Sequence, residues 1–195
     1  MDIICVTDRK QSVGDFYRRI EQIALAKPTL IILREKDLSE NEFNEVCLRC
    51  REIVPMDILS VNTFIDIAKN NEIRNIHLSF EDFIKKGIEK MKYFKKIGVS
   101  IHSKDEAIIA EKRGASYLIA GHIFATDCKK GVAPRGMDFL EEVCKVVDIP
   151  VYAIGGITKD KVKDVKKAGA SGICVMSSIM KTSEPYKEVK GYLEL

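Results

Sequence analysis

Residues 121–131 gather several reactive side chains: they read Gly-His-Ile-Phe-Ala-Thr-Asp-Cys-Lys-Lys-Gly and directly follow an apolar run. An imidazole has an unperturbed pKa of ~6.5, which suits proton transfer at neutral pH. We therefore predict that His122 is a general acid/base and that Lys130 holds an anionic substrate beside it. Capping of a core strand is the alternative role for His122. His77 lies within an apolar run and is predicted to be a core histidine.

Polar residues also follow other apolar runs. Arg34 and Lys36 offer two cations suited to a carboxylate or a phosphate, and a solvated run of charges is an equal alternative. Asn62 and Ser100 could hydrogen-bond a ligand or cap the next helix. We take these four residues as candidates for substrate binding.

Small residues near the C-terminus indicate a phosphate site, because backbone N–H groups in tight turns before helices bind anions. The candidate phosphate ligands are Gly155, Gly156, Met176, Ser177 and Ser178. A plain turn between a strand and a helix is the alternative reading of the two glycines.

The cysteines and the charge exclude other classes of protein. Cys47 and Cys50 form a Cys-x-x-Cys without a second pair or suitably spaced histidines, so they predict core packing, and no metal site is expected. The net charge of +3 is spread along the chain, which argues against nucleic acid as a partner. No apolar run approaches the ~18 residues of a membrane span, and the first residues do not form a signal sequence. We expect a soluble cytoplasmic protein.

The scaffold that positions these residues can be predicted from length and pattern. With 195 residues, 46% hydrophobic side chains and no linker-like stretch, residues 1–195 should form one domain. Short apolar runs alternate with charged segments of helical spacing, as buried parallel strands alternate with crossover helices. Gly114 and Gly169 mark the ends of two such helices. The runs are 3–6, 30–33, 58–61, 76–78, 97–101, 117–120, 151–154 and 173–176.

An open doubly wound sheet and a closed (β/α)8 barrel both fit this alternation, and eight runs favour the single barrel. Enzymes with this fold bind substrates at the carboxyl ends of the strands and often bind phosphate after the last two strands. The glycine and serine pairs follow the last two runs, which favours phosphate over a plain turn. We expect a small phosphorylated substrate, and the sequence leaves a homodimer open.

Five motifs stand in one order along the chain: Val6-Thr7-Asp8, Leu33-Arg34-Glu35-Lys36-Asp37, Gly98-Val99-Ser100-Ile101-His102-Ser103, Ala153-Ile154-Gly155-Gly156-Ile157-Thr158 and Ala168-Gly169-Ala170-Ser171-Gly172. Together they resemble the superfamily of thiamine phosphate synthase and the TenI-type thiazole tautomerase. The likeness runs almost end to end and implies a role in thiamine biosynthesis.

Details of the resemblance favour the tautomerase. The synthase joins a pyrimidine pyrophosphate to a thiazole phosphate with Mg²⁺, and here Thr63 stands where its metal-binding aspartate would be, although Asp82 matches a remaining ligand. The loop 121–131 instead resembles that of the tautomerase, with His122 as the proton-transfer residue. The resemblance thus implies a cofactor-free isomerase that converts a carboxythiazole phosphate to its aromatic tautomer. A Mg²⁺-dependent thiamine phosphate synthase is the alternative, and a non-catalytic regulator of the TenI type is the second alternative.

Overall fold

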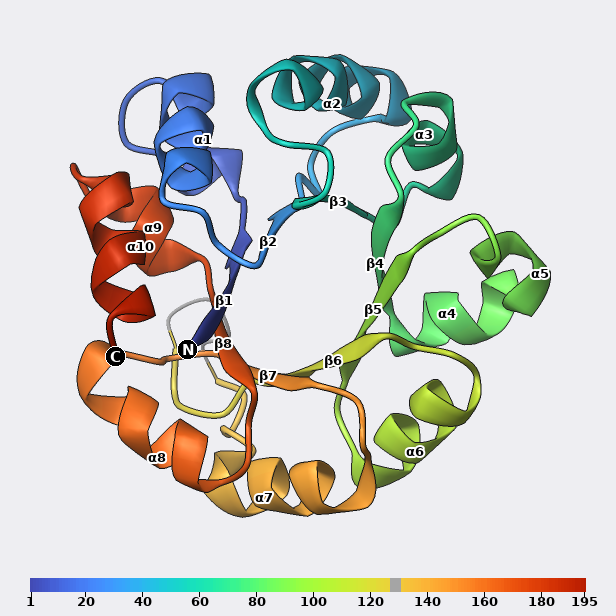
Figure 1. The fold of residues 1–195 in the computed structure, drawn as a ribbon, viewed down its shortest axis with the longest axis vertical. Helices are drawn as coiled ribbons and strands as arrows, with labels where there is room; N and C mark the ends of the chain where they lie inside the picture. Colours follow the sequence, from blue (N-terminus) through green and yellow to red (C-terminus); the bar gives the residue numbers. More distant parts are fainter. Residues whose placement is uncertain (127–130) are drawn as a thin grey trace.

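Eight parallel strands form a closed barrel in the computed structural model, which describes residues 1–126 and 131–195. Neighbouring strands follow one another around the barrel in chain order (Figure 1). The strands are β1 Asp2–Val6, β2 Leu30–Leu33, β3 Leu59–Asn62, β4 Asn75–Ser79, β5 Lys96–Ile101, β6 Tyr117–Gly121, β7 Val151–Ile154 and β8 Gly172–Val175. The predicted apolar runs coincide with these strands to within one residue at each end. The predicted (β/α)8 barrel is confirmed, and the open doubly wound sheet is wrong.

Helices surround the barrel on its outer side (Figure 1). They are α1 Phe16–Leu25, α2 Glu40–Ile53, α3 Ile65–Asn70, α4 Phe80–Lys86, α5 Ile88–Met91, α6 Lys104–Lys112, α7 Gly136–Val146, α8 Val162–Lys167, α9 Ser177–Lys181 and α10 Pro185–Leu193. Short 3-10 turns, Arg9–Gln11 and Lys159–Lys161, follow β1 and β7. Cys47 and Cys50 are buried in α2 with free thiols, as expected of packing residues.

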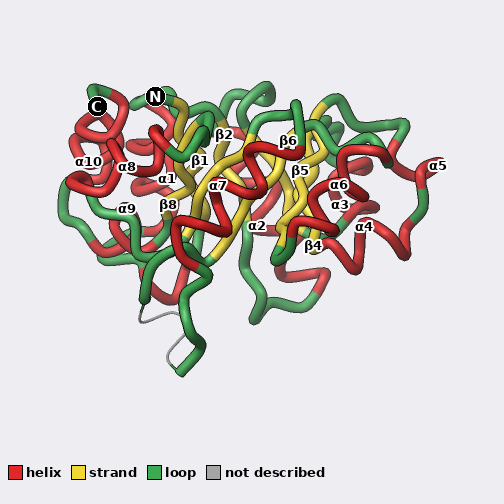
Figure 2. The backbone as a smooth tube through the Cα atoms, turned by 90° about the horizontal axis from the view of Figure 1, so that it is seen from below, coloured by secondary structure: helices red, strands yellow, loops and turns green. Residues whose placement is uncertain are grey.

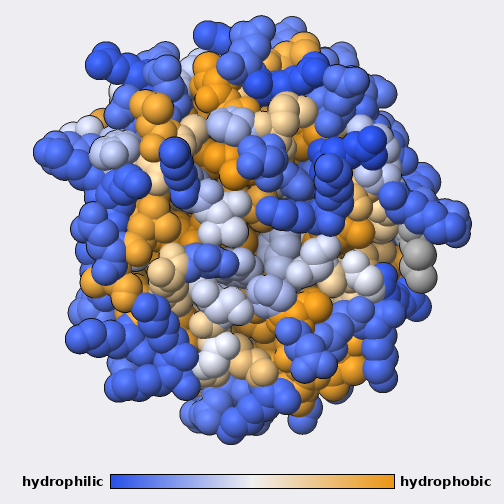
Figure 3. Space-filling view, viewed as in Figure 1, coloured by the Kyte–Doolittle hydropathy of each residue, from blue (hydrophilic) through white to orange (hydrophobic). Residues whose placement is uncertain are grey.

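The two edges of the barrel differ. Both chain termini lie at one edge, and the described parts of the loop between β6 and α7 extend from the opposite edge (Figure 2). Seen down the barrel, the surface is ringed by hydrophilic residues and is less polar toward the centre (Figure 3). Among residues 1–126 and 131–195, no helix has the length and hydrophobicity that crossing a bilayer requires.

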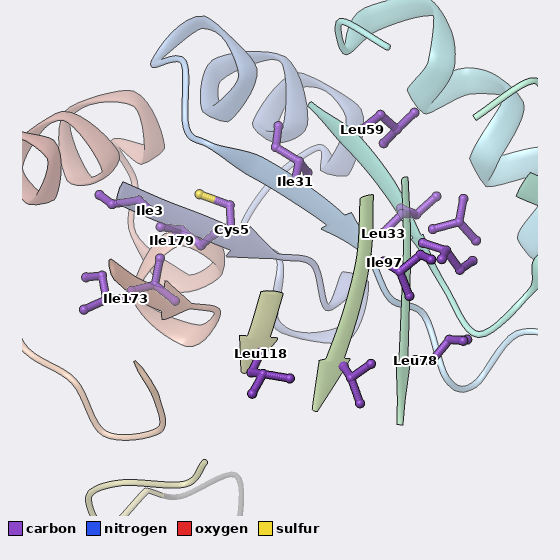
Figure 4. Close-up of a cluster of buried hydrophobic side chains, with 14 of the residues drawn as sticks. Ile3, Cys5, Ile31, Leu33, Leu59, Leu78, Ile97, Leu118, Ile173 and Ile179 are labelled. Atoms are coloured by element: carbon purple, nitrogen blue, oxygen red, sulfur yellow. The ribbon is translucent and has the colours of Figure 1, made fainter. Parts of the chain in front are cut away.

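Alternation of side chains along the strands creates two apolar cores. Outward side chains such as Ile3, Cys5 and Ile31 pack beneath the helices (Figure 4). The alternate side chains along the strands face inward and fill the barrel interior. They are Ile4, Val6, Leu30, Ile32, Tyr117, Ile119, Tyr152 and Cys174. Because the interior is filled, a ligand site has to lie at an open end of the barrel.

Candidate active site

A cavity of about 1040 Å³ opens at the carboxyl ends of the strands. The predicted site residues that line it are Arg34, Lys36, Asn62, Ser100, His122, Gly155, Gly156, Met176, Ser177 and Ser178. Lys130 lies outside the described residues. The fold therefore brings together all of the other candidates, and the ligand that each of them binds stays a prediction.

A buried hydrogen-bond network positions the cationic side of the cavity. The Thr7 hydroxyl donates to Glu35 Oε1 at 2.6 Å and accepts the Arg34 backbone N–H at 3.0 Å. The other carboxylate oxygen of Glu35 accepts the Arg9 N–H at 2.7 Å. Burial raises the pKa of Glu35, and the hydrogen bond from Thr7 opposes that rise. The network joins the ends of β1 and β2, so the backbone that bears Arg34 and Lys36 is held in place.

His77, which we predicted to be a core residue, is buried but also forms part of the cavity floor. Its Nε2 lies 2.8 Å from Ser100 Oγ, and its Nδ1 lies 3.2 Å from the Tyr117 hydroxyl. Burial, and then the charge of Arg34, lower the pKa of His77 to about 3, so the ring is neutral at pH 7. A neutral imidazole donates through one nitrogen and accepts through the other. His77 therefore orients the Ser100 hydroxyl at the base of the cavity.

His122 lies at the base of the loop between β6 and α7 and is 4% exposed. Its Nε2 is 3.2 Å from the Val132 carbonyl oxygen, and its own carbonyl accepts the Arg135 N–H at 2.9 Å. These two bonds connect the beginning of the loop to its end. The geometry thus gives His122 a role in holding the loop, beside its place in the cavity wall.

Gly155 and Gly156 form the turn after β7, and both have positive φ, 101° and 63°. A Cβ on Gly155 would overlap the His122 side chain, and a Cβ on Gly156 would overlap the Ala125 carbonyl. Glycine is therefore needed here for close packing against the β6–α7 loop as well as for backbone conformation. After the neighbouring strand β8, the Ser177 hydroxyl donates to Gln11 Oε1 at 2.8 Å, which fixes the start of α9.

His77 and Lys161 are among the residues that line this cavity and were absent from the predicted ligands. The first, His77, faces inward because Asn75, His77 and Ser79 alternate with apolar residues along β4, a signal that the sequence does contain. The second, Lys161, follows the glycine turn and lines the cavity. Nothing in the sequence distinguishes Lys161 from the solvated lysines around it.

The acidic side chain of Asp82 bears on metal binding. Among the described residues that line the cavity, Asp82 is the only acid, and its Oδ2 accepts the Ser79 hydroxyl at 2.8 Å. The described part of the chain holds no group of three or more His, Cys, Asp or Glu residues that could bind a metal. Mg²⁺ in phosphate-transferring sites commonly takes one or two carboxylates together with substrate phosphates. Asp82 fits an ion that is shared with a substrate, and does not fit a preformed cage.

A closed (β/α)8 barrel with a cavity at the carboxyl ends of its strands, where Arg34 and Lys36 lie on one wall and a glycine turn on another, has the architecture typical of barrel enzymes. A family model described as thiamine monophosphate synthase matches residues 3–179. The chain belongs to this family, and the predicted superfamily is confirmed.

Known relatives are similar to this protein over nearly the whole chain. A thiamine-phosphate synthase of Clostridium beijerinckii is 36% identical over 182 residues, which cover 91% of this chain and 87% of the relative. A protein of Aquifex aeolicus named putative thiamine-phosphate synthase 2 is 33% identical, with 91% and 97% covered. The solved structure of thiamine phosphate pyrophosphorylase from Pyrococcus furiosus superposes with a TM-score of 0.84 at 29% identity, covering 99% of this chain and 94% of that one.

These relatives correct the predicted function. The thiazole tautomerase that we took as the leading reading is wrong, because relatives 33–36% identical over most of the chain are named as synthases. The prediction gave one loop, residues 121–131, more weight than the similarity of the whole chain. In the structure, His122 of that loop is hydrogen-bonded to the Val132 carbonyl, which is a structural contact and does not require an acid/base role.

Proposed function

We propose that the protein is a thiamine-phosphate synthase, a transferase that joins a pyrimidine pyrophosphate to a thiazole phosphate. The observation that supports this best is a single cavity with two walls suited to anions. Arg34 and Lys36 lie on one wall, and the Gly155–Gly156 turn lies with Ser177 on another. Its volume of about 1040 Å³ lies at the upper end for one drug-sized ligand, so two small substrates can share it.

The reaction forms a C–N bond between the pyrimidine methylene carbon and the thiazole nitrogen. The C–O bond to pyrophosphate breaks, and the leaving group takes the electron pair. Negative charge therefore develops on pyrophosphate, and cations placed where charge develops accelerate such a step. Arg34 and Lys36 would stabilise the leaving group, Asn62 and Ser100 would orient the pyrimidine, and Gly155, Gly156, Met176, Ser177 and Ser178 would bind the thiazole phosphate.

We infer that the transferase uses Mg²⁺, which when bound supplies charge neutralisation on the pyrophosphate. Asp82 would hold the ion, with the remaining oxygens coming from the substrate and water. Thr63 lines the cavity and brings only a hydroxyl, where the resemblance to the synthase implies a second metal-binding carboxylate. A weak, substrate-dependent affinity for Mg²⁺ is therefore part of this proposal.

Incubation with both substrates and Mg²⁺, followed by chromatographic detection of thiamine phosphate, tests the proposal. Product should require both substrates and should disappear with EDTA. Arg34→Ala should reduce kcat strongly, whereas Arg113→Ala, an exposed arginine after α6, should not. No product from the wild-type protein at saturating substrates and Mg²⁺ would refute the proposed function.

A further inference from the structure

Lys161 places a positive charge on the glycine side of the cavity. It ends the 3-10 turn Lys159–Lys161 and lines the cavity together with Gly156. Its Nζ donates to the Gly156 carbonyl oxygen at 2.9 Å and lies 4.6 Å from the centroid of the Phe124 ring. A lysine ammonium has three N–H donors and is attracted to the face of an aromatic ring. The Gly156 carbonyl and the Phe124 ring therefore hold the Lys161 ammonium in one place, and they require only part of its hydrogen-bond donor capacity.

A charge at this position matters because a phosphate monoester carries roughly −1.5 to −2 at neutral pH. The backbone N–H groups of the Gly155–Gly156 turn can donate hydrogen bonds to a phosphate but carry no formal charge. Arg34 and Lys36 follow β2, which β1 and β8 separate from β7 in the barrel. The two walls thus present separate cations to separate anionic groups.

We propose that Lys161 binds the monophosphate of the thiazole substrate and discriminates it from the alcohol that lacks the phosphate. The ligand's identity rests on the proposed function, while the position of the charge rests on the contacts of Lys161 itself. Lys161 would not contact the reacting atoms, so its substitution should change KM for one substrate rather than kcat.

Steady-state kinetics of Lys161→Ala and Lys161→Arg test this, with Lys163→Ala as the matched control, because Lys163 is exposed on α8. Hydrogen bonds to charged groups contribute ~1.5–3 kcal/mol, which converts to about a tenfold to hundredfold rise in KM for the thiazole phosphate in Lys161→Ala. KM for the pyrimidine pyrophosphate should not change, and Lys161→Arg should restore most of the affinity. Equal losses for both substrates, or a Lys161→Ala variant that behaves like Lys163→Ala, would overturn the proposal.

Calorimetric titration separates this inference from the proposed function, because binding needs no turnover. The wild-type protein should bind thiazole phosphate more tightly than thiazole alcohol, and Lys161→Ala should remove most of that difference. If the difference persists in Lys161→Ala, or is missing in the wild type, Lys161 is not the phosphate ligand. A lysine-dependent difference without any thiamine phosphate formation would refute the synthase alone.

Discussion

Substitution of Gly98 on β5 tests whether side chains packed in the barrel interior hold the residues of the cavity in place. A methyl group on its Cα would overlap the Tyr117 ring and would lie 2.5 Å from His77 Nδ1. Tyr117 is 4% exposed and packs edge-on against Tyr152, with ring centroids 5.7 Å apart, so the ring cannot move without disturbing a second one. Gly98→Ala should therefore displace the tyrosine that His77 contacts.

The expected loss of stability has two parts. Overpacking of a core typically costs about 1–3 kcal/mol. Displacement of the Tyr117 hydroxyl leaves the buried Nδ1 of His77 without its partner, which costs about 1–3 kcal/mol more. The total of about 2–6 kcal/mol is a large fraction of the ~5–15 kcal/mol by which a domain is usually stable. Since His77 also orients Ser100, substrate affinity should fall in the protein that remains folded.

Urea denaturation followed by circular dichroism measures this effect, with Gly191→Ala as the control. Gly191 lies within α10, and a Cβ there would meet only the end of the Lys159 side chain, at 2.8 Å. That substitution should change stability by less than about 1 kcal/mol, because alanine is the better helix former. Removal of the ring in Tyr117→Leu should reduce the cost of Gly98→Ala by at least about 1 kcal/mol. An equal cost in both backgrounds, or a Gly98→Ala variant as stable as Gly191→Ala, would refute this reasoning.

Three further changes have expected outcomes. Because burial raises the pKa of Glu35, the folded protein binds its proton more tightly, and this stabilising contribution is present at low pH and lost as pH rises through the folded pKa. Urea titrations between pH 4 and 7 should show wild-type stability falling relative to Glu35→Gln as pH rises, and the opposite slope would contradict this assignment. His122→Gln keeps an N–H donor for the Val132 carbonyl and should retain kcat in thiamine phosphate formation, whereas a ~10²–10⁴-fold loss would show acid/base catalysis. Thr63 has φ 71°, which asparagine and aspartate tolerate better, so Thr63→Asn and Thr63→Asp should each gain about 1 kcal/mol in thermal or urea unfolding. Only Thr63→Asp should lower the Mg²⁺ concentration for half-maximal activity, and an equal shift in Thr63→Asn would argue against a metal role there.

The scaffold was predictable because the barrel strands are covered on both faces. Such strands must be apolar along their length, so each appears in the sequence as a short continuous run. Gly114 and Gly169, predicted to end helices, have positive φ of 90° and 94° after α6 and α8. A helix often ends at a residue with left-handed backbone conformation, which glycine adopts without a steric penalty. This requirement depends only on the chain at that point, so it can be read from the sequence. Placement of the candidates in one cavity then followed from the fold, since strands of a parallel barrel all end on the same face.

Roles within the cavity depend on contacts that no single segment encodes. Lys161 differs from the lysines around it because its Nζ contacts the Gly156 carbonyl and the Phe124 ring. His77 acquires its neutral state from burial and from the charge of Arg34, which follows another strand. The wrong prediction of a tautomerase has the same origin. The sequence does not show the partners of His122, and without them a histidine in a loop suggested proton transfer. The missing carboxylate at Thr63 was likewise taken as evidence against pyrophosphate chemistry. An ion shared with a pyrophosphate needs fewer protein ligands than a preformed cage, so a missing carboxylate is compatible with the transferase reaction that we propose.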